Sequence, residues 1–155
     1  ERVVYIENDA GLTESIELIN SVCIQHKAAF EEYVKTKTDI TPKQYYEQLD
    51  SNYIMVDDMD DLAAKYQMRI KELVSLFTLA AESGFGIVVT HNSSKPKSFD
   101  ELCKWFRTST NGLVVGSQGA AGIYPVVPVK DTPRTGEGLL YINNTYERLQ
   151  IPLYQ

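Results

Sequence analysis

The sequence has few cysteines, no excess of basic residues and no long hydrophobic run, and each of these shortages excludes a class of protein. Cys23 and Cys103 are the only cysteines among 155 residues, and they lie far apart, which excludes zinc fingers and paired redox motifs. We expect both to be reduced thiols on apolar helix faces, although the sequence leaves a disulfide between them open. The 15 basic and 21 acidic residues give a net charge of −6, which argues against nucleic acid as the main partner. No apolar run approaches the roughly 18 residues of a membrane span.

What the chain does have is an alternation of short apolar runs and longer helical patterns. Buried strands are predicted for four apolar runs, at residues 3–6, 53–56, 87–89 and 113–115. Apolar residues spaced three and four apart predict helices at residues 12–34 and 62–80, with another from residue 99. Thr41-Pro42-Lys43-Gln44 is a capping box, which predicts a short helix to about Asp50.

This order of elements predicts the fold class. Strands separated by helices imply right-handed crossovers and a mostly parallel sheet between helices, a three-layer α/β sandwich. The β-like runs after residue 124 have no helices between them and predict edge or hairpin strands. Because no linker interrupts the pattern, we expect a single domain over residues 1–155.

Polar residues follow three of the predicted strands, at the carboxyl ends where ligands collect in a parallel sheet. The most informative are Asp57 and Asp58, which directly follow the apolar run Tyr53–Val56. This is the pattern of a Walker B element, in which the first acid orients water on Mg²⁺ and the second polarises an attacking water. Acids at the start of a helix also complement its dipole, and the sequence leaves both interpretations open.

The other half of a nucleotide site is missing from the sequence. No glycine is followed by lysine, so the phosphate-binding motif Gly-x-x-x-x-Gly-Lys-Ser/Thr is absent, and the glycine-rich stretch 116–122 is interpreted as a turn. The chain is therefore not expected to hydrolyse ATP unaided. His26 is expected to be structural or at the surface, whereas His91 follows a strand and is a candidate ligand contact, although it has no partner for a catalytic triad.

Taken together, these segments resemble the FtsK/SpoIIIE-type P-loop ATPases, and most closely the C-terminal ATPase domain of the EssC/EccC coupling proteins of type VII secretion. The resemblance spans nearly the whole chain, in order. It rests on Val3–Asp9 as the strand after the P-loop helix, Tyr53–Asp58 as Walker B, Gly84–Asn92 as the strand that ends in a polar sensor, and Gly136–Tyr141 with Arg148–Pro152 as the closing glycine turn and hairpin.

The resemblance implies a RecA-like P-loop fold and roles for particular residues. Asp57 would hold Mg²⁺ through water, Asp58 would activate the nucleophile, Asn92 would sense the γ-phosphate of ATP, and His91 would lie beside the nucleotide. Three positions depart from the family. The usual catalytic glutamate is Asp58, the sensor glutamine is Asn92, and an arginine common in the DNA translocases is replaced by Ala81. These losses suggest a degenerate ATPase domain that binds ATP weakly or not at all.

The family's P-loop strand and helix would precede Glu1, so we expect this chain to be a partial domain. Without the P-loop strand, the edge of the run 87–89 would be left unpaired, which natural sheets avoid. The resemblance implies a cytoplasmic domain of a membrane-anchored parent protein. The domain would contact the membrane only through that parent and would work beside the neighbouring ATPase domains of the same chain. The resemblance also allows the intact system to be a hexamer. The implied cargo is small helical secreted proteins of the WXG type.

Two other functions remain open at this point. The first is an active ATPase whose Walker A motif lies upstream. The second is a receiver-like signalling domain, in which a strand also ends in Val-Asp-Asp. The receiver interpretation is weaker because the next predicted strand ends in Thr90-His91, where a receiver needs a phosphoacceptor aspartate.

Overall fold

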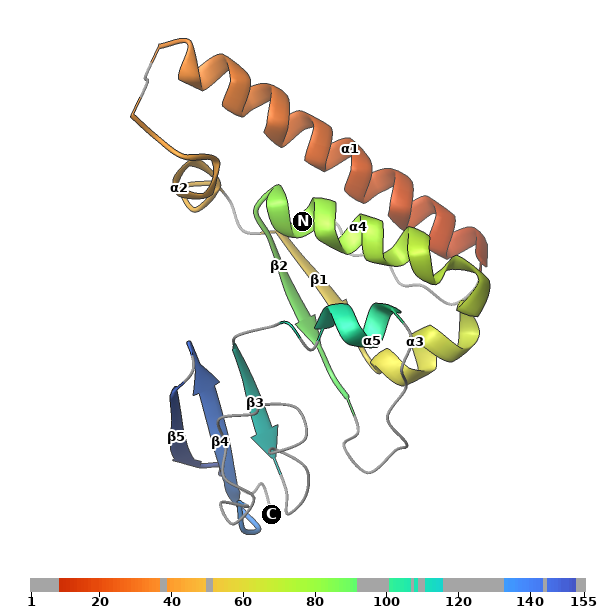
Figure 1. The fold of residues 1–155 in the computed structure, drawn as a ribbon, viewed down its shortest axis with the longest axis vertical. Helices are drawn as coiled ribbons and strands as arrows, with labels where there is room; N and C mark the ends of the chain where they lie inside the picture. Colours follow the sequence, from red (N-terminus) through yellow and green to blue (C-terminus); the bar gives the residue numbers. More distant parts are fainter. Residues whose placement is uncertain are drawn as a thin grey trace. The chain divides into compact units, whose positions relative to one another are not determined.

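The structure is a computed structural model that describes residues 9–36, 39–49, 52–91, 101–106, 108, 111–115, 133–143 and 145–152. The chain divides into two compact units, which are described separately (Figure 1). Unit 1 is Glu1–Asp57 with Tyr66–Thr90, and unit 2 is Asp58–Lys65 with His91–Gln155. The predicted strand at 3–6 and the β-like run at 124–129 lie outside the described residues. The expectation of a single domain stays a prediction.

Unit 1 begins with the two helices that the sequence predicts. Helix α1 spans Asp9–Val34, and helix α2 spans Pro42–Tyr46. Thr41 caps α2 as expected, because its hydroxyl accepts from Gln44 N at 3.4 Å while Gln44 Oε1 accepts from Thr41 N at 3.0 Å. The capping box is confirmed, although α2 ends at Tyr46 rather than near Asp50.

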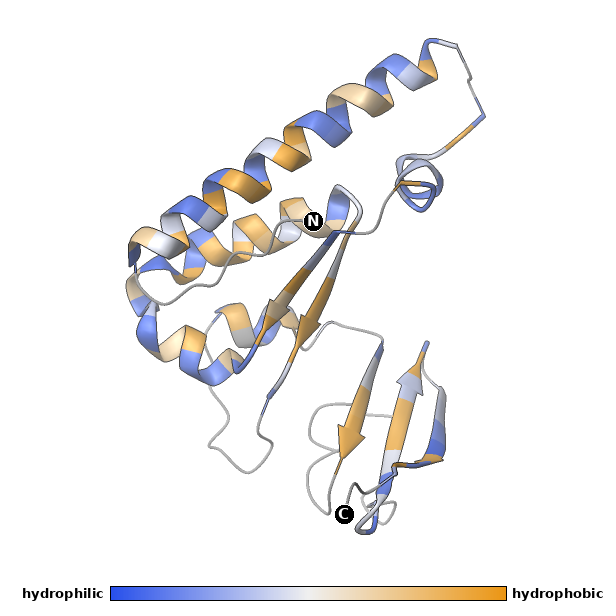
Figure 2. Ribbon diagram, turned by 180° about the vertical axis from the view of Figure 1, so that it is seen from behind, coloured by the Kyte–Doolittle hydropathy of each residue, from blue (hydrophilic) through white to orange (hydrophobic). Residues whose placement is uncertain are grey.

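The core of unit 1 forms where α1 and a second long helix, α4 (Ile70–Glu82), pack against each other (Figure 1). Figure 2 shows the reason, since hydrophobic colours dominate α4 and recur at intervals along α1. The buried hydrophobic side chains of these helices are Leu12, Ile16, Cys23, Leu73, Leu76, Phe77 and Ala80. Cys23 is a free thiol, and burial raises its pKa, so the expectation of a buried reduced cysteine is confirmed there.

The sheet of unit 1 is a parallel pair of strands, β1 (Asn52–Val56) and β2 (Phe85–Val89). The register pairs Asn52 with Phe85 and Val56 with Val89, so the two carboxyl ends coincide. Side chains alternate along β1, with Val56 buried and Met55 exposed, and α4 packs against β2. The predicted strands at 53–56 and 87–89 are both confirmed.

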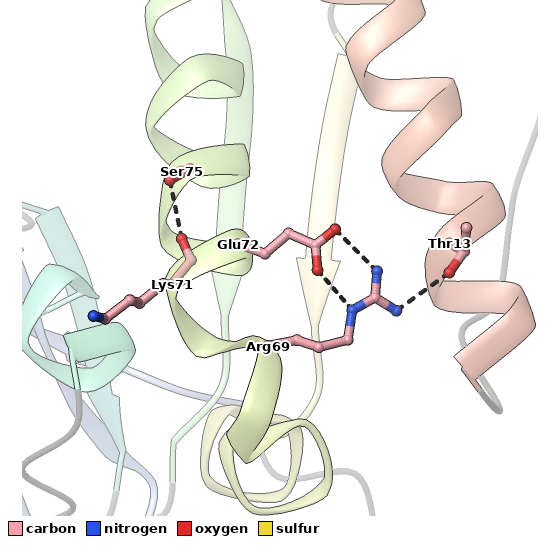
Figure 3. Close-up of polar contacts among 5 residues, drawn as sticks. All are labelled: Thr13, Arg69, Lys71, Glu72 and Ser75. Atoms are coloured by element: carbon pink, nitrogen blue, oxygen red, sulfur yellow. Dashed lines mark hydrogen bonds and ion pairs between the residues drawn. The ribbon is translucent and has the colours of Figure 1, made fainter.

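The helix predicted over residues 62–80 is not continuous. It divides into α3 (Met59–Lys65), a 3-10 turn η1 (Gln67–Arg69) and α4, with the first break at Tyr66, whose φ of −113° and ψ of 36° leave the helical region. Arg69 fixes the second junction, since its guanidinium donates to both Glu72 carboxylate oxygens at 2.6 and 3.0 Å and to Thr13 Oγ1 on α1 at 3.2 Å (Figure 3). The apolar spacing continues through this break, so periodicity alone could not reveal it.

Unit 2 contains two short helices and an antiparallel sheet. Helix α3 packs against α5 (Glu101–Phe106), and Leu102 and Ala63 are buried there. The sheet has the order β3 (Asn111–Val115), β4 (Glu137–Ile142), β5 (Thr145–Gln150), and all its pairings are antiparallel. Strands β4 and β5 form the hairpin predicted from the C-terminal β-like runs. Strand β3 belongs to this antiparallel group rather than to the parallel pair.

One face of this sheet is a small core of Val114, Leu139 and Tyr141, with Tyr146 packed against it. Asn143 has a φ of 46° in the tight turn between β4 and β5, a left-handed conformation that asparagine tolerates. The described residues therefore form a mixed α/β structure with a parallel pair and a C-terminal antiparallel group, as the sequence predicts.

Candidate functional site

The parallel register of β1 and β2 brings the segments that follow them together. Thr90 N donates to Val56 O at 2.9 Å, which extends the ladder one residue beyond β2. In unit 1 the Thr90 hydroxyl also donates to Asp57 Oδ1 in a short hydrogen bond. The acid after β1 and the threonine after β2 are thus direct neighbours at the carboxyl ends of the strands, where the sequence places the candidate site.

Asp57 keeps the properties that a magnesium-binding role needs. Its side chain is exposed, and its contact with Thr90 is a hydrogen bond from a neutral hydroxyl rather than an ion pair. Mg²⁺ is commonly held by one or two carboxylates with water completing its shell. The arrangement at Asp57 is therefore compatible with the family's Mg²⁺–ATP, and the assignment of Asp57 stays a prediction.

Asp58 has a structural role that is visible in unit 2. Its Oδ1 accepts from Asp60 N at 2.7 Å and from Asp61 N at 3.3 Å, and its carbonyl oxygen accepts from Leu62 N at 3.0 Å. These are the contacts of a residue that caps the N-terminus of α3, where a carboxylate satisfies free backbone N–H groups and complements the helix dipole. The helix-dipole interpretation of the acids therefore has direct support at Asp58, whereas its catalytic role stays a prediction.

His91 has a partner that sequence reasoning missed. Its Nδ1 lies 2.8 Å from Asp60 Oδ2 in unit 2, and the two side chains are only 18% and 13% exposed. Both atoms are buried, and the pair lacks the alignment of a good hydrogen bond, so its attraction is mainly that of a charged pair when the imidazole is protonated. No sequence motif joins these residues. The order of elements is the one sequence signal that could have indicated this pairing, because Asp60 follows β1 and His91 follows β2, and these strands are parallel neighbours.

The other predicted groups are only partly covered by the structure. Asn92, the residues 7–8 and the glycine-rich stretch 116–122 lie outside the described residues.

Within the described ranges, no group of three or more His, Cys, Asp or Glu residues could hold a metal ion. None of the helices seen in those ranges is both long and apolar enough to cross a membrane. His26, interpreted as structural or surface, contacts Ser83 O through its Nδ1 at 2.7 Å.

Comparison with known proteins gives matches in structure rather than in sequence. No protein-family model and no curated protein matches the sequence. A solved structure of ATPases 2 and 3 of EssC from Geobacillus thermodenitrificans matches with a TM-score of 0.70 and 16% identity, over 98% of this chain and 27% of that chain. A second structure, the cytoplasmic domain of EssC, matches with a TM-score of 0.76 and 16% identity, over 96% of this chain and 29% of that chain.

The chain has the fold of an EssC ATPase domain. The resemblance inferred from the sequence is confirmed at the level of fold, and so is the expected α/β class. The chain spans less than a third of either EssC structure, at 27% and 29% of their lengths. Any function of the whole EssC protein can therefore be assigned to this chain only as a proposal.

Proposed function

We propose that this chain is an ATPase-fold domain of a type VII secretion coupling protein, and that it serves mainly to recognise cargo and to hold the assembly together. The likeness of its fold to EssC supports the first part of the proposal. The cap that Asp58 forms on α3 favours the second part, because it gives this acid a structural role in place of a catalytic one. A carboxylate oxygen that accepts two backbone N–H groups is held in a fixed place by the start of the helix.

One feature of the sequence agrees with a recognising role. The net charge of −6 suits a protein cargo better than DNA, the substrate of related translocases. In this proposal the parent is membrane-anchored with its ATPase domains in the cytoplasm, and the cargo is a small helical protein of the WXG type.

A second candidate is an active ATPase that takes its Walker A motif from upstream. The exposed carboxylate of Asp57 at the end of β1 favours this alternative, because it could still orient a magnesium-bound water. Asp58 would then activate the nucleophile and Asn92 would sense the γ-phosphate. ATP and Mg²⁺ are required only in this alternative.

The two candidates differ in nucleotide titration and turnover of the intact domain, which includes the upstream segment that the second candidate requires. We expect a fluorescent ATP analogue with Mg²⁺ to bind no tighter than millimolar, and phosphate release to stay at background. Micromolar, Mg²⁺-dependent binding with turnover would contradict the recognising role. The variant Asp58→Asn sharpens the test, because asparagine also caps helices but cannot accept a proton. Turnover that disappears in Asp58→Asn and persists in a Glu82→Gln control would establish the active ATPase.

Cargo recognition needs its own measurement. Titration of a WXG-type protein from the same secretion system should give saturable binding that does not depend on added nucleotide. Absence of binding, with or without Mg²⁺–ATP, would contradict the recognising role.

A further inference from the structure

A surface cleft of about 770 Å³ lies in unit 1 between the C-terminal end of α1 and helix α2. Tyr33 and Ile40 provide its apolar lining, and Asp39 and Glu47 contribute carboxylates. No lysine, arginine or histidine is among the lining residues in the described part of the chain. The cleft thus combines an aromatic ring with two carboxylates, and the candidate site above does not use it.

The walls of this cleft are held by contacts within and between α1 and α2. The Tyr33 ring packs against Tyr45, with ring centres 4.8 Å apart. The capping box of Thr41 and Gln44 fixes the start of α2, and Gln48 Nε2 donates to Gln44 O at 2.9 Å. A cleft whose lining is already ordered loses less conformational entropy when a ligand binds.

Electrostatics give the cleft a negative character. The C-terminal end of α1 carries the negative end of the helix dipole, and the last turn of α1 contains no basic residue to offset it. Lys43 lies 4.0 Å from Glu47, but these side chains are 86% and 63% exposed, so water and salt weaken their attraction. Lys35 is engaged with Glu32 at 2.6 Å. Asp39 and Glu47 therefore supply two carboxylates to the cleft lining for a positively charged side chain.

We propose that this cleft binds a lysine or arginine side chain presented by a partner protein. The cation would lie against the face of Tyr33 and between the carboxylates of Asp39 and Glu47, while its methylene stem would contact Ile40. A bare metal ion fits poorly, because no group of three metal-ligating side chains exists in the described residues. The volume lies within the usual 300–1,000 Å³ range of ligand pockets, enough for one long side chain and its flanking backbone.

The test compares two peptides by fluorescence anisotropy. One is a labelled heptapeptide with a central arginine between leucines, and the other differs only in carrying citrulline, the neutral isostere of arginine. We expect the arginine peptide to bind about tenfold more tightly, and this preference to shrink as salt is raised. Equal binding of the two peptides, or binding of neither, would overturn the proposal.

Matched variants locate the binding. The pair Asp39→Asn and Glu47→Gln should weaken binding of the arginine peptide roughly five- to tenfold. The pair Glu17→Gln and Glu82→Gln changes the net charge equally at exposed positions outside the lining, and should leave binding unchanged. Equal losses in both double variants would show attraction to the overall charge rather than to the cleft, and would also overturn the proposal.

The contribution of the ring is separable from that of the carboxylates. Tyr33→Phe keeps the aromatic face and should bind normally, whereas Tyr33→Leu should lose about threefold in affinity. Because Tyr33 packs on Tyr45, helix content is compared by circular dichroism in each variant. Binding of the arginine peptide does not require nucleotide or a secretion role, so its failure would leave the proposed function untouched.

Discussion

At the scale of single residues, Asp58 shows how one side chain satisfies two sequence patterns at once. An acid two places beyond the end of a strand fits a Walker B element, and the same acid just before a helix fits an N-cap. The sequence could predict that Asp57 and Asp58 lie at the end of a strand. It could not show which N–H groups Asp58 would meet, because that depends on where α3 begins.

Replacement of Asp58 separates the cap from a catalytic role. Asp58→Ala should lower the free energy of unfolding by about 1 kcal/mol, because the N–H groups of Asp60 and Asp61 lose their acceptor. Asp58→Asn should retain most of the stability, since asparagine caps helices about as well as aspartate. Urea denaturation measures both. Equal stability of Asp58→Ala and the unmodified protein would show that the cap contributes nothing.

The strand ends were predictable at this scale, but the pairings of the residues that follow them were not. Asp57 follows β1 and His91 lies two residues beyond the end of β2, as the confirmed strands imply, and the roles of both residues stay predictions. The bond from Thr90 to Asp57 and the pairing of Asp60 with His91 depend on the register of β1 and β2 and on side-chain rotamers. Neither the register nor the rotamers can be predicted from the spacing of apolar residues in the sequence.

The Arg69–Glu72 pair gives a prediction for pH dependence. The hydrogen bonds from Arg69 lower the pKa of Glu72 below its ordinary value. A lowered carboxyl pKa adds stability above the unfolded value of about 4.3, and this stability is lost as pH falls through the lower folded value. The side chain of Glu72 is 46% exposed, so solvent screening limits the contribution to a few tenths of a kcal/mol.

Glu72→Gln should therefore be slightly less stable than the unmodified protein at pH 7, and this difference should close below about pH 4. Urea titrations at several pH values measure it. High salt should reduce the difference at pH 7, because the pair is near the surface. A difference that stays constant from pH 7 to pH 3 would rule out the ion pair as its cause.

At the scale of elements, the strongest predictions came from patterns that act locally. The capping box determined where α2 starts, and the three-and-four spacing determined α1 and α4, because these signals need only neighbours in the chain. The division of the second long helix at Tyr66 was missed. No proline or glycine marks that position, and the apolar spacing continues through it, so the break depends on packing that local patterns do not encode.

The end of α4 depends on Gly84. Its φ of +89° is a left-handed conformation, and a Cβ there would lie 2.6 Å from Tyr46 Cβ. Gly84→Ala should therefore cost about 1–3 kcal/mol, from backbone strain and from displacement of Tyr46. Gly11→Ala in the first turn of α1 is the matched control, and should be neutral or slightly stabilising, because alanine favours helices. Thermal unfolding of equal midpoint in both variants would contradict this account.

At the scale of the whole molecule, the chain passes between its two units three times, after Asp57, after Lys65 and after Thr90. Neither unit is one continuous segment. Helix α3 has only 7 residues, too short to persist alone in water, and both its ends continue directly into unit 1. Unfolding of unit 1 would release the chain on both sides of α3, so we expect the two units to unfold together.

Two spectroscopic probes report the units separately. Far-UV circular dichroism follows mainly unit 1, whose helices α1 and α4 have 26 and 13 residues, against 7 and 6 in α3 and α5 of unit 2. Fluorescence follows unit 2 through Trp105, the single tryptophan of the chain. We expect the two unfolding curves in urea to coincide, as they do for a cooperative two-state transition.

Gly84→Ala, a change confined to unit 1, makes this comparison decisive. If the units unfold together, the lost stability is shared, and the midpoints of both curves shift by the same amount. A shift of the dichroism curve alone, with the Trp105 curve unchanged, would show independent unfolding. The prediction of one domain over residues 1–155 would then be wrong, because a domain in this sense is the set of residues that lose their structure in one transition.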